Sequence, residues 1–268
     1  MLRYLRDSID GQPKENAFEV TDARTGERTG LCVIYTGLYP NLFPVRPHLI
    51  RIRIEGEPES YERLMGAALA RSYDIARKLK LPARAFVECP PENEELFQLL
   101  LDIGMKNNDG LLRMQLDDLR SYDTALPMGT SIFEDDLSDL QEQNYFLERY
   151  NQLMREGVDR SWLETYVDHE NFRRFLCVNA SGLVSEVICW TDGGTGVIDF
   201  VQTSRKWRSR GYAKYILSRA CTYLREKGCP YVQCVLRAKW PYALKSFESV
   251  GFYQKDLIMR YPGIDIDV

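Results

Sequence analysis

A chain of 268 residues, 44% of them hydrophobic and 28% charged, has an ordinary globular composition and suits two domains of moderate size. Its formal net charge of -4 and pI near 5.5 argue against nucleic-acid binding as the main role. The sequence shows no charged-then-apolar leader and no apolar run of about 18 residues, so it predicts a cytoplasmic protein without a membrane span.

The cysteines and histidines predict no metal site. None of the seven cysteines forms a C-x-x-C pair, and most fall inside strand or helix patterns, where a small apolar side chain packs well. We therefore expect reduced core residues, namely Cys32, Cys89, Cys177, Cys189, Cys221, Cys229 and Cys234. The sequence contains only two histidines, His48 and His169, which argues against a histidine-based catalytic triad or a histidine-rich zinc site.

The first half of the chain alternates between strand and helix patterns. The clearest strand is Leu49–Ile54, where three isoleucines alternate with two arginines at the period of a half-buried strand. We expect a short helix within residues 1–17, strands at 18–23, 31–35 and 49–54, a helix at 61–80, a strand at 85–89, a helix at 94–103 and a strand at 111–116. The strand at 111–116 is predicted to complete this half.

The second half begins with a strand at 130–133 and a helix at 137–156. Ser161 is predicted to cap a second helix that runs to Val167. A hairpin of strands 174–178 and 183–190 follows, and then a strand at 199–203. A long helix is predicted from Gly211 onward and a further strand at 231–236.

Both halves show the same order of elements: strand, long helix, strand, helix, then a glycine followed by an apolar residue. Leu81-Pro82 corresponds to Cys229-Pro230 at a spacing of 148, and Gly104-Met105 to Gly251-Phe252 at a spacing of 147. This near-constant spacing indicates an internal repeat. It predicts two domains, 1–120 and 121–268, joined near residues 117–128.

A cationic segment separates the strand at 199–203 from the long helix. Arg205, Lys206, Arg208 and Arg210 lie there with no acidic residue among them. Unpaired amides at a helix N-terminus bind anions, and nearby cations strengthen that preference. Gly211 has no Cβ, so the backbone can turn tightly and a diphosphate can approach it. The segment therefore predicts a phosphate site.

The six residues from Arg208 to Ala213 match the pattern R/Q-x-x-G-x-G/A. With the flanking strand and helix, and with Ala243-x-x-x-Phe247-x-x-x-Gly251-Phe252, they resemble the diphosphate loop and a later segment of the GNAT superfamily of acyl-CoA-dependent N-acyltransferases. The resemblance implies an α+β protein with two tandem GNAT-like modules, each a mixed, mostly antiparallel sheet flanked by helices. It further implies acetyl transfer from acetyl-CoA, directly and in a ternary complex, to an amine of a small molecule or peptide.

The resemblance also assigns residues to the cofactor. Backbone groups of Val201 and Thr203 are expected to hold the pantetheine arm and the acyl carbonyl of CoA. The full set implied to bind CoA is Val201, Gln202, Thr203, Arg208, Ser209, Arg210, Gly211, Tyr212, Ala213, Lys214, Trp240 and Phe247.

Acyl transfer to an amine requires a group that removes the amine proton. Asp199 and Glu186 are the candidates. Phe247 stands where many GNAT proteins have a tyrosine that protonates the departing thiolate, and phenylalanine donates no proton. Tyr242 or Tyr212 could replace it. A non-catalytic CoA-binding regulatory or docking protein therefore remains an alternative, and RNA binding through the cationic loop is a third.

The first module is predicted to be degenerate. Arg63 to Ala68 also satisfies the loop pattern, but four glutamates, Glu55, Glu57, Glu59 and Glu62, stand where the second module has cations. A diphosphate would be repelled there, so we expect no cofactor site but a cleft wall or docking surface. The glutamates hint at a cationic acceptor such as a polyamine, aminoglycoside or peptide amine. The sequence leaves open a monomer or a homodimer.

Overall fold

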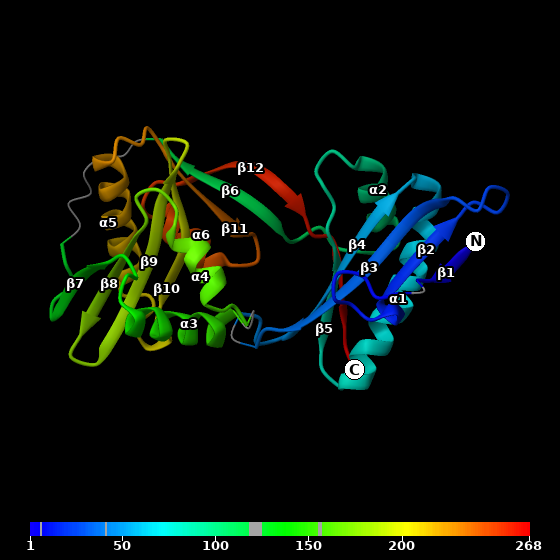
Figure 1. The fold of residues 1–268 in the computed structure, drawn as a ribbon, viewed down its shortest axis with the longest axis horizontal. Helices are drawn as coiled ribbons and strands as arrows, with labels where there is room; N and C mark the ends of the chain where they lie inside the picture. The colour runs from blue at the N-terminus through cyan, green and yellow to red at the C-terminus, as the bar shows by residue number, and fades with distance from the viewer. Residues whose placement is uncertain (6, 41, 118–124, 155–156) are drawn as a thin grey trace. The chain divides into compact units, whose positions relative to one another are not determined.

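The computed structural model describes all residues except 6, 41, 118–124 and 155–156. Its contacts divide the chain into two compact units, each consisting of one sheet with helices packed against it (Figure 1). Of the described residues, the first unit comprises 1–111, 152–154 and 258–268, and the second comprises the rest, so the ends of three elements cross the division. Each of these elements is described below with the unit that contains most of it or its sheet.

The first unit contains a six-stranded sheet in the order β1-β2-β3-β4-β5-β13. Its strands are β1 Leu2–Tyr4, β2 Ala17–Thr21, β3 Arg28–Leu38, β4 His48–Gly56, β5 Ala83–Val87 and β13 Gly263–Ile266. The strands β4 and β5 are parallel and the other neighbours antiparallel, so the sheet is mixed.

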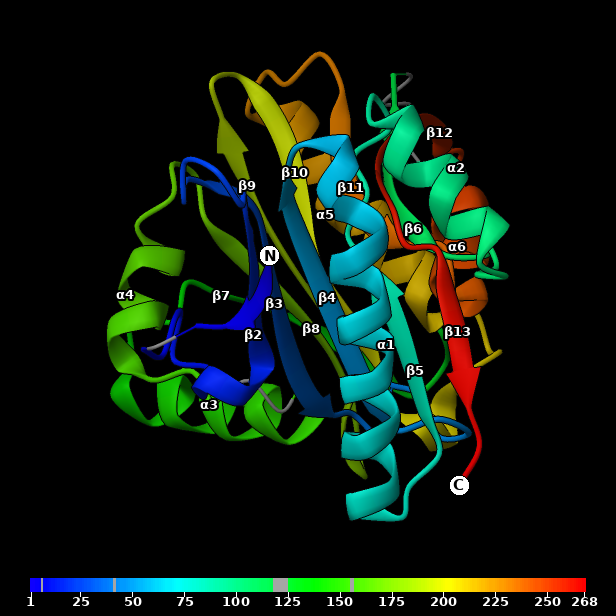
Figure 2. The same cartoon turned by 90° about the vertical axis from the view of Figure 1, so that its right-hand side faces the viewer.

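The helices α1 (Pro58–Leu79) and α2 (Glu94–Asp102) complete the first unit, and Figure 2 shows α1 lying along the sheet. The isoleucines of β4 are buried against α1, where Leu64 and Ala68 belong to the same core cluster. Arg51 and Arg53 alternate with these isoleucines and are exposed on the opposite face. The period-two prediction for β4 is confirmed.

The predicted helix within residues 1–17 is wrong. The segment contains β1 and only a short 3-10 turn, Lys14–Asn16. Asp10 and Gly11 both have positive φ, and Pro13 has no amide hydrogen to donate. These three residues explain why no α-helix propagates through the segment.

The second unit contains a seven-stranded sheet in the order β12-β6-β11-β10-β9-β8-β7. Its strands are β6 Gly110–Leu116, β7 Thr130–Asp135, β8 Arg173–Asn179, β9 Gly182–Asp192, β10 Thr195–Thr203, β11 Val232–Arg237 and β12 Tyr253–Arg260. Its helices are α3 Leu140–Met154, α4 Arg160–Val167, α5 Tyr212–Glu226 and α6 Pro241–Glu248. The two sheets and their helices confirm the predicted α+β class.

The helix α4 has a different cap from the predicted Ser161. The Asp159 carboxylate accepts a hydrogen bond from the Trp162 amide at 3.1 Å and one from the Ser161 hydroxyl at 2.6 Å. Aspartate at this position satisfies a free amide of the first turn. The helix therefore begins at Arg160.

One predicted strand lies in the other sheet. Residues 111–116 form most of β6, but β6 lies between β12 and β11 in the second sheet and does not complete the first. The first sheet instead receives β13, which pairs with β5 from Gly263↔Phe86 to Ile266↔Ala83. The proposed junction at 120/121 falls within residues 118–124, outside the described part of the chain.

All seven cysteines are buried, as predicted for core residues, and none forms a disulfide. Burial raises the pKa of Cys32 and Cys221 to about 12. Among the described residues, no group of three or more histidines, cysteines or acidic residues is arranged to hold a metal ion. None of the described helices combines the length and apolar character needed to cross a membrane.

Candidate functional site

The parallel strands β10 and β11 pair over only a short distance. Their register contains two residue pairs, Gly196↔Val232 and Val197↔Gln233, although both strands continue beyond them. On its other edge β10 stays paired with β9 as far as Thr203↔Ser185. Within the described strands, the edge of β10 from Asp199 to Thr203 that points toward β11 therefore has no strand partner. Its backbone groups are available to an extended ligand.

The chain turns sharply between β10 and α5. A 3-10 turn, Arg205–Trp207, is followed by Ser209 with φ of +60° and Gly211 with φ of +85°. Gly211 precedes α5, and no side chain caps the amides of the first turn. A Cβ at Gly211 would meet nothing within 4 Å, and residues 209–211 are exposed, so the outside of this turn is open. Consecutive free amides at such a turn form an anion-binding concavity.

The same loop carries unpaired cations. Arg205, Lys206, Arg208 and Arg210 are exposed, and in the described part of the chain none forms an ion pair. The Arg208 Nε donates to the Thr203 carbonyl at 3.2 Å, and the Arg210 guanidinium lies 5.0 Å from the centre of the Trp207 ring. The loop therefore presents positive charge beside free amides, which is the environment that a diphosphate requires.

Three side-chain atoms near the open edge are buried without a hydrogen-bond partner among the described residues. They are Gln202 Oε1 on β10, Trp207 Nε1 in the loop, and Trp240 Nε1 directly before α6. A buried polar atom without a partner is costly, so such atoms are typical of sites where a ligand supplies the partner. Together with the free amides and cations, these atoms fit a bound CoA.

Asp199 lies at a β-bulge in β10. The register with β9 shifts there, because Ile198 pairs with Cys189 while Phe200 pairs with Ile188. Ile198 packs in the core on the α5 side, whereas Phe200 contacts Phe146 of α3, with ring centres 5.9 Å apart. Asp199 also points to the α3 and α4 side, where its Oδ2 accepts a hydrogen bond. A bulge turns two consecutive side chains toward the same face of a sheet.

The donor to Asp199 is Tyr166 of α4, which the sequence analysis did not single out. The Tyr166 hydroxyl donates to Asp199 Oδ2 at 2.5 Å, and its side chain is only 8% exposed. Burial and the nearby Asp199 carboxylate raise the pKa of Tyr166 well above its usual value. The only signal in the sequence was Trp162 and Tyr166 at helical spacing, which is equally typical of core packing.

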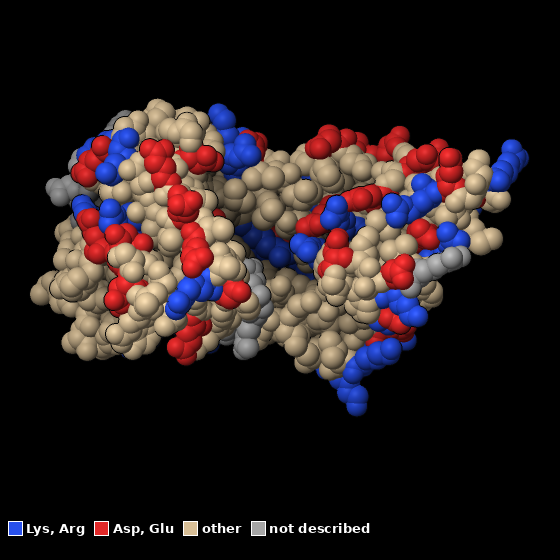
Figure 3. Space-filling view, in the orientation of Figure 1, with Lys and Arg blue, Asp and Glu red and all other residues tan. Residues whose placement is uncertain are grey.

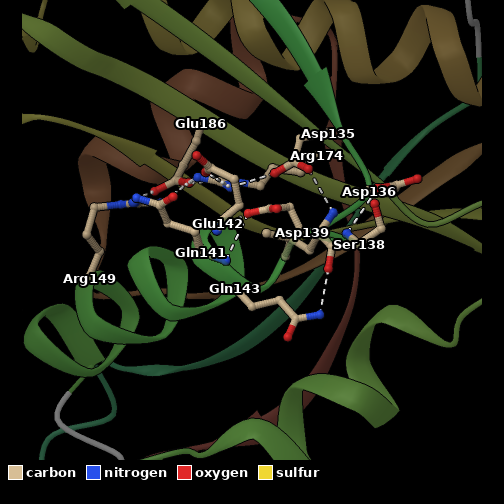
Figure 4. Close-up of polar contacts among 11 residues, drawn as sticks. Asp135, Asp136, Ser138, Asp139, Gln141, Glu142, Gln143, Arg149, Arg174 and Glu186 are labelled. Atoms are coloured by element: carbon tan, nitrogen blue, oxygen red, sulfur yellow. Dashed lines mark hydrogen bonds and ion pairs between the residues drawn. The ribbon is translucent and has the colours of Figure 1, made fainter.

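Glu186, the second candidate base, belongs to an ion-pair network. Its carboxylate is 1% exposed, and its Oε2 lies 3.0 Å from Arg149 Nη2 and 3.0 Å from Arg174 Nε. Figure 4 shows the Arg174 guanidinium between Glu186 and Asp135, with Nη1 2.8 Å from Asp135 Oδ2. Two arginines therefore hold the Glu186 carboxylate in ion pairs, and its role as a base stays a prediction.

The aromatic candidates for thiolate protonation are placed unfavourably. Phe247 is 1% exposed and packs edge-on against Phe252 in the core, with ring centres 5.0 Å apart. Tyr212 is buried in the same core beside Trp207. Tyr242 lies in the first turn of α6 and is 76% exposed. Of the two predicted substitutes for the missing tyrosine, Tyr212 is thus buried and Tyr242 exposed, and the role of either stays a prediction.

Comparisons with known proteins agree with this geometry. The family model described as "Acetyltransferase (GNAT) family" matches residues 135–252. The crystal structure of a GCN5-related N-acetyltransferase from Sphaerobacter thermophilus is similar with a TM-score of 0.54 at 16% identity, over 96% of this chain and 82% of that protein.

A conserved protein from Enterococcus faecalis, titled a probable N-acyltransferase, is similar with a TM-score of 0.50 at 10% identity, over 82% of this chain and 54% of its own. No curated protein matches the chain. At these identities the structural likenesses show the fold alone.

The matched segment contains β10, the cationic loop, α5 and the Ala243–Phe252 segment from which the resemblance was first drawn. The likeness to the Sphaerobacter protein extends over both sheets. The fold is thus one of two GNAT-like modules, and residues 135–252 match the model of the GNAT acetyltransferase family.

Proposed function

We propose that the second unit is an acyl-CoA-dependent N-acyltransferase that transfers acetyl from acetyl-CoA directly to an amine of a small molecule or peptide in a ternary complex. The observation that carries this proposal is the combination of an open β10 edge with a cationic, uncapped helix N-terminus at the end of the same strand. A pantetheine arm and a diphosphate require these two features in this order.

The diphosphate of CoA would lie against the amides from Ser209 to Ala213, with Arg208 and Arg210 beside it. The open backbone groups of Val201 and Thr203 would hold the pantetheine arm by main-chain hydrogen bonds. CoA supplies the acetyl thioester. Backbone N–H groups directed at the acyl oxygen would stabilise the negative charge that develops on it during transfer.

The acceptor amine must lose a proton before or during attack. A lysine-like amine has a pKa near 10.4, so at neutral pH it is mostly protonated. Asp199 is exposed at the bulge on β10 and is the candidate that receives this proton. Phe247 gives the departing thiolate no proton, and a thiol with pKa near 8.5 leaves at a cost of roughly one or two factors of ten in rate.

A charge-reversal experiment tests the binding half of the proposal. Arg208→Glu with Arg210→Glu places two carboxylates beside the diphosphate, and we expect CoA affinity measured by calorimetry to fall by about 100-fold or more. The matched control is Arg63→Glu, an exposed arginine on α1 within the first unit's copy of the loop pattern. Unchanged affinity in the double variant would refute the proposed site.

The buried Phe247 favours a second candidate, a CoA-binding protein without turnover. Steady thiol release from acetyl-CoA with spermidine, kanamycin or a lysine peptide as acceptor, at least 100-fold slower in Asp199→Ala, would support the enzyme. Tight CoA binding without release to any acceptor would support the second candidate instead.

A further inference from the structure

We propose that Tyr166 is a positioning residue for Asp199, holding one carboxylate oxygen so that the other is left to take the proton of the acceptor amine. This role rests on the proposed acyl transfer. It assigns Tyr166 no contact with the reacting atoms, because the residue acts through Asp199.

The hydrogen bond divides the Asp199 carboxylate into two unlike oxygens. Oδ2 accepts the Tyr166 hydroxyl at 2.5 Å, while Oδ1 accepts no hydrogen bond from any residue that the structure describes. Asp199 is exposed and Tyr166 is buried, so the fixed oxygen is on the protein side of the carboxylate. A short O–H···O⁻ bond is among the stronger hydrogen bonds in proteins and defines the plane of the carboxylate.

The tyrosine itself is firmly held. Its ring stacks on Trp162 with centres 4.6 Å apart, and it meets Trp190 of β9 edge-on at 5.2 Å. The Asp159 cap fixes the start of α4, and the bulge fixes the direction of Asp199. Since the surrounding structure fixes both residues, their hydrogen bond holds the Asp199 carboxylate in one orientation.

Tyr166 remains a donor at any working pH. Its raised pKa keeps the phenol protonated, so the proton stays on the tyrosine and the negative charge on the aspartate. Donation to the charged form lowers the free energy of the carboxylate. Removing the hydroxyl should therefore leave the orientation of the Asp199 carboxylate less restricted.

The groups around the pair are few enough to be separated. Burial raises the pKa of the Cys189 and Cys234 thiols, which are therefore neutral near pH 7. Tyr150 of α3 packs on Trp162, and the ring of His169, just after α4, lies 6.4 Å from that of Tyr166. Arg149 and Glu186, from α3 and β9, are paired with each other. His169→Gln is therefore a control for an indirect effect of this imidazole.

The test compares Tyr166→Phe with the wild-type protein. The carboxyl carbon of Asp199, assigned through Asp199→Asn, is observed by ¹³C NMR at pH 7 without any substrate. We expect its resonance to move in Tyr166→Phe, because the hydrogen bond to Oδ2 is lost, and to keep its position in Trp162→Phe, which alters the packing but keeps the hydroxyl.

The kinetic readout uses acetyl-CoA and whichever of spermidine, kanamycin and a lysine peptide is turned over fastest. We expect kcat to fall about tenfold in Tyr166→Phe and KM for acetyl-CoA to stay the same. When Asp199→Asn is already present, adding Tyr166→Phe should not lower kcat further, because Tyr166 acts through Asp199.

The possible negative results distinguish the proposed function from the role of Tyr166. Wild-type protein that transfers acetyl to none of these acceptors would refute the proposed function, and the role of Tyr166 in transfer with it. Normal turnover combined with an unchanged carboxyl resonance of Asp199 in Tyr166→Phe would refute the role of Tyr166 alone. If Tyr166→Phe lowered kcat by the same factor in the wild-type and the Asp199→Asn backgrounds, the role of Tyr166 through Asp199 would also be refuted.

Discussion

The two modules differ most clearly where a strand passes into the long helix. In the first unit a single residue, Glu57, separates β4 from α1, whereas in the second unit eight residues, Ser204 to Gly211, separate β10 from α5. In the short connection, the chain's own backbone satisfies or removes the free amides before α1. The Glu57 amide donates to the Thr29 carbonyl at 2.8 Å, and Pro58 occupies the first position of the helix.

The sheets differ beside these connections. The parallel strands β4 and β5 pair at five positions from His48↔Ala83 to Ile52↔Val87, while β10 and β11 pair at two. A closed pair of strands leaves no backbone edge for an extended ligand, and a one-residue loop leaves no row of free amides. The two units therefore share the order of strand, long helix and strand, but they differ in the strand edge and in the loop that the proposed site uses.

A first way to break the comparison is to separate the halves. If the modules were independent copies, fragments 1–120 and 121–268 would each fold alone. We expect neither to do so, because fragment 121–268 lacks β6 from the interior of its sheet and fragment 1–120 lacks β13. Circular dichroism and NMR amide dispersion would show this loss, and co-expression of the two fragments should restore folding. A cooperatively unfolding fragment 121–268 would contradict the expectation.

The charges on the sheet faces provide a second contrast. Arg174 is fully buried between carboxylates of the second unit, whereas Arg53 is half-exposed on β4 of the first. Arg174→Met would leave buried acidic groups without their partner, so the free energy of unfolding should fall by about 3–5 kcal/mol. Arg53→Met should change it by less than about 0.5 kcal/mol. Urea denaturation measures both, and similar values for the two variants would contradict the assignment of Arg174.

The two glycines before the long helices sharpen the comparison further. Gly56 has φ of +128°, and a Cβ there would lie 2.3 Å from the Thr29 carbonyl oxygen, whereas a Cβ at Gly211 would meet nothing. We expect Gly56→Ala to lower the free energy of unfolding by about 3 kcal/mol through strain and collision. Gly211→Ala should cost only about 1 kcal/mol, from its positive φ.

The same pair of variants separates stability from binding. Gly211→Ala should weaken CoA binding several-fold by turning the amides of the loop, while Gly56→Ala should leave the affinity of the folded protein unchanged. Calorimetry at a temperature where both variants are folded would measure this difference. Equal CoA affinity in Gly211→Ala and the wild type would remove the loop backbone from the proposed site.

The sequence predicted those structural features that depend on residues close together in the chain. The alternation in β4 and the cationic turn before α5 are local, and both formed as expected. The sheet that receives β6 could not be predicted in this way, because strand periodicity shows that a face is buried but not which strands lie beside it. The ion pair of Glu186 could not be predicted for a similar reason, since its partner Arg174 lies on a neighbouring strand. Tyr166 was missed because an aromatic residue on a helix is typical of a core.

The place of β13 has a consequence for the order of folding. About 175 residues lie between the end of β5 and the start of β13, its partner in the first sheet. During synthesis, the edge of β5 has no strand to pair with until nearly all of the second unit has left the ribosome. Contacts this distant along the chain form slowly, and an uncovered strand edge favours pairing with other molecules. Rapid translation at high expression should therefore favour aggregation of this protein before either sheet is complete.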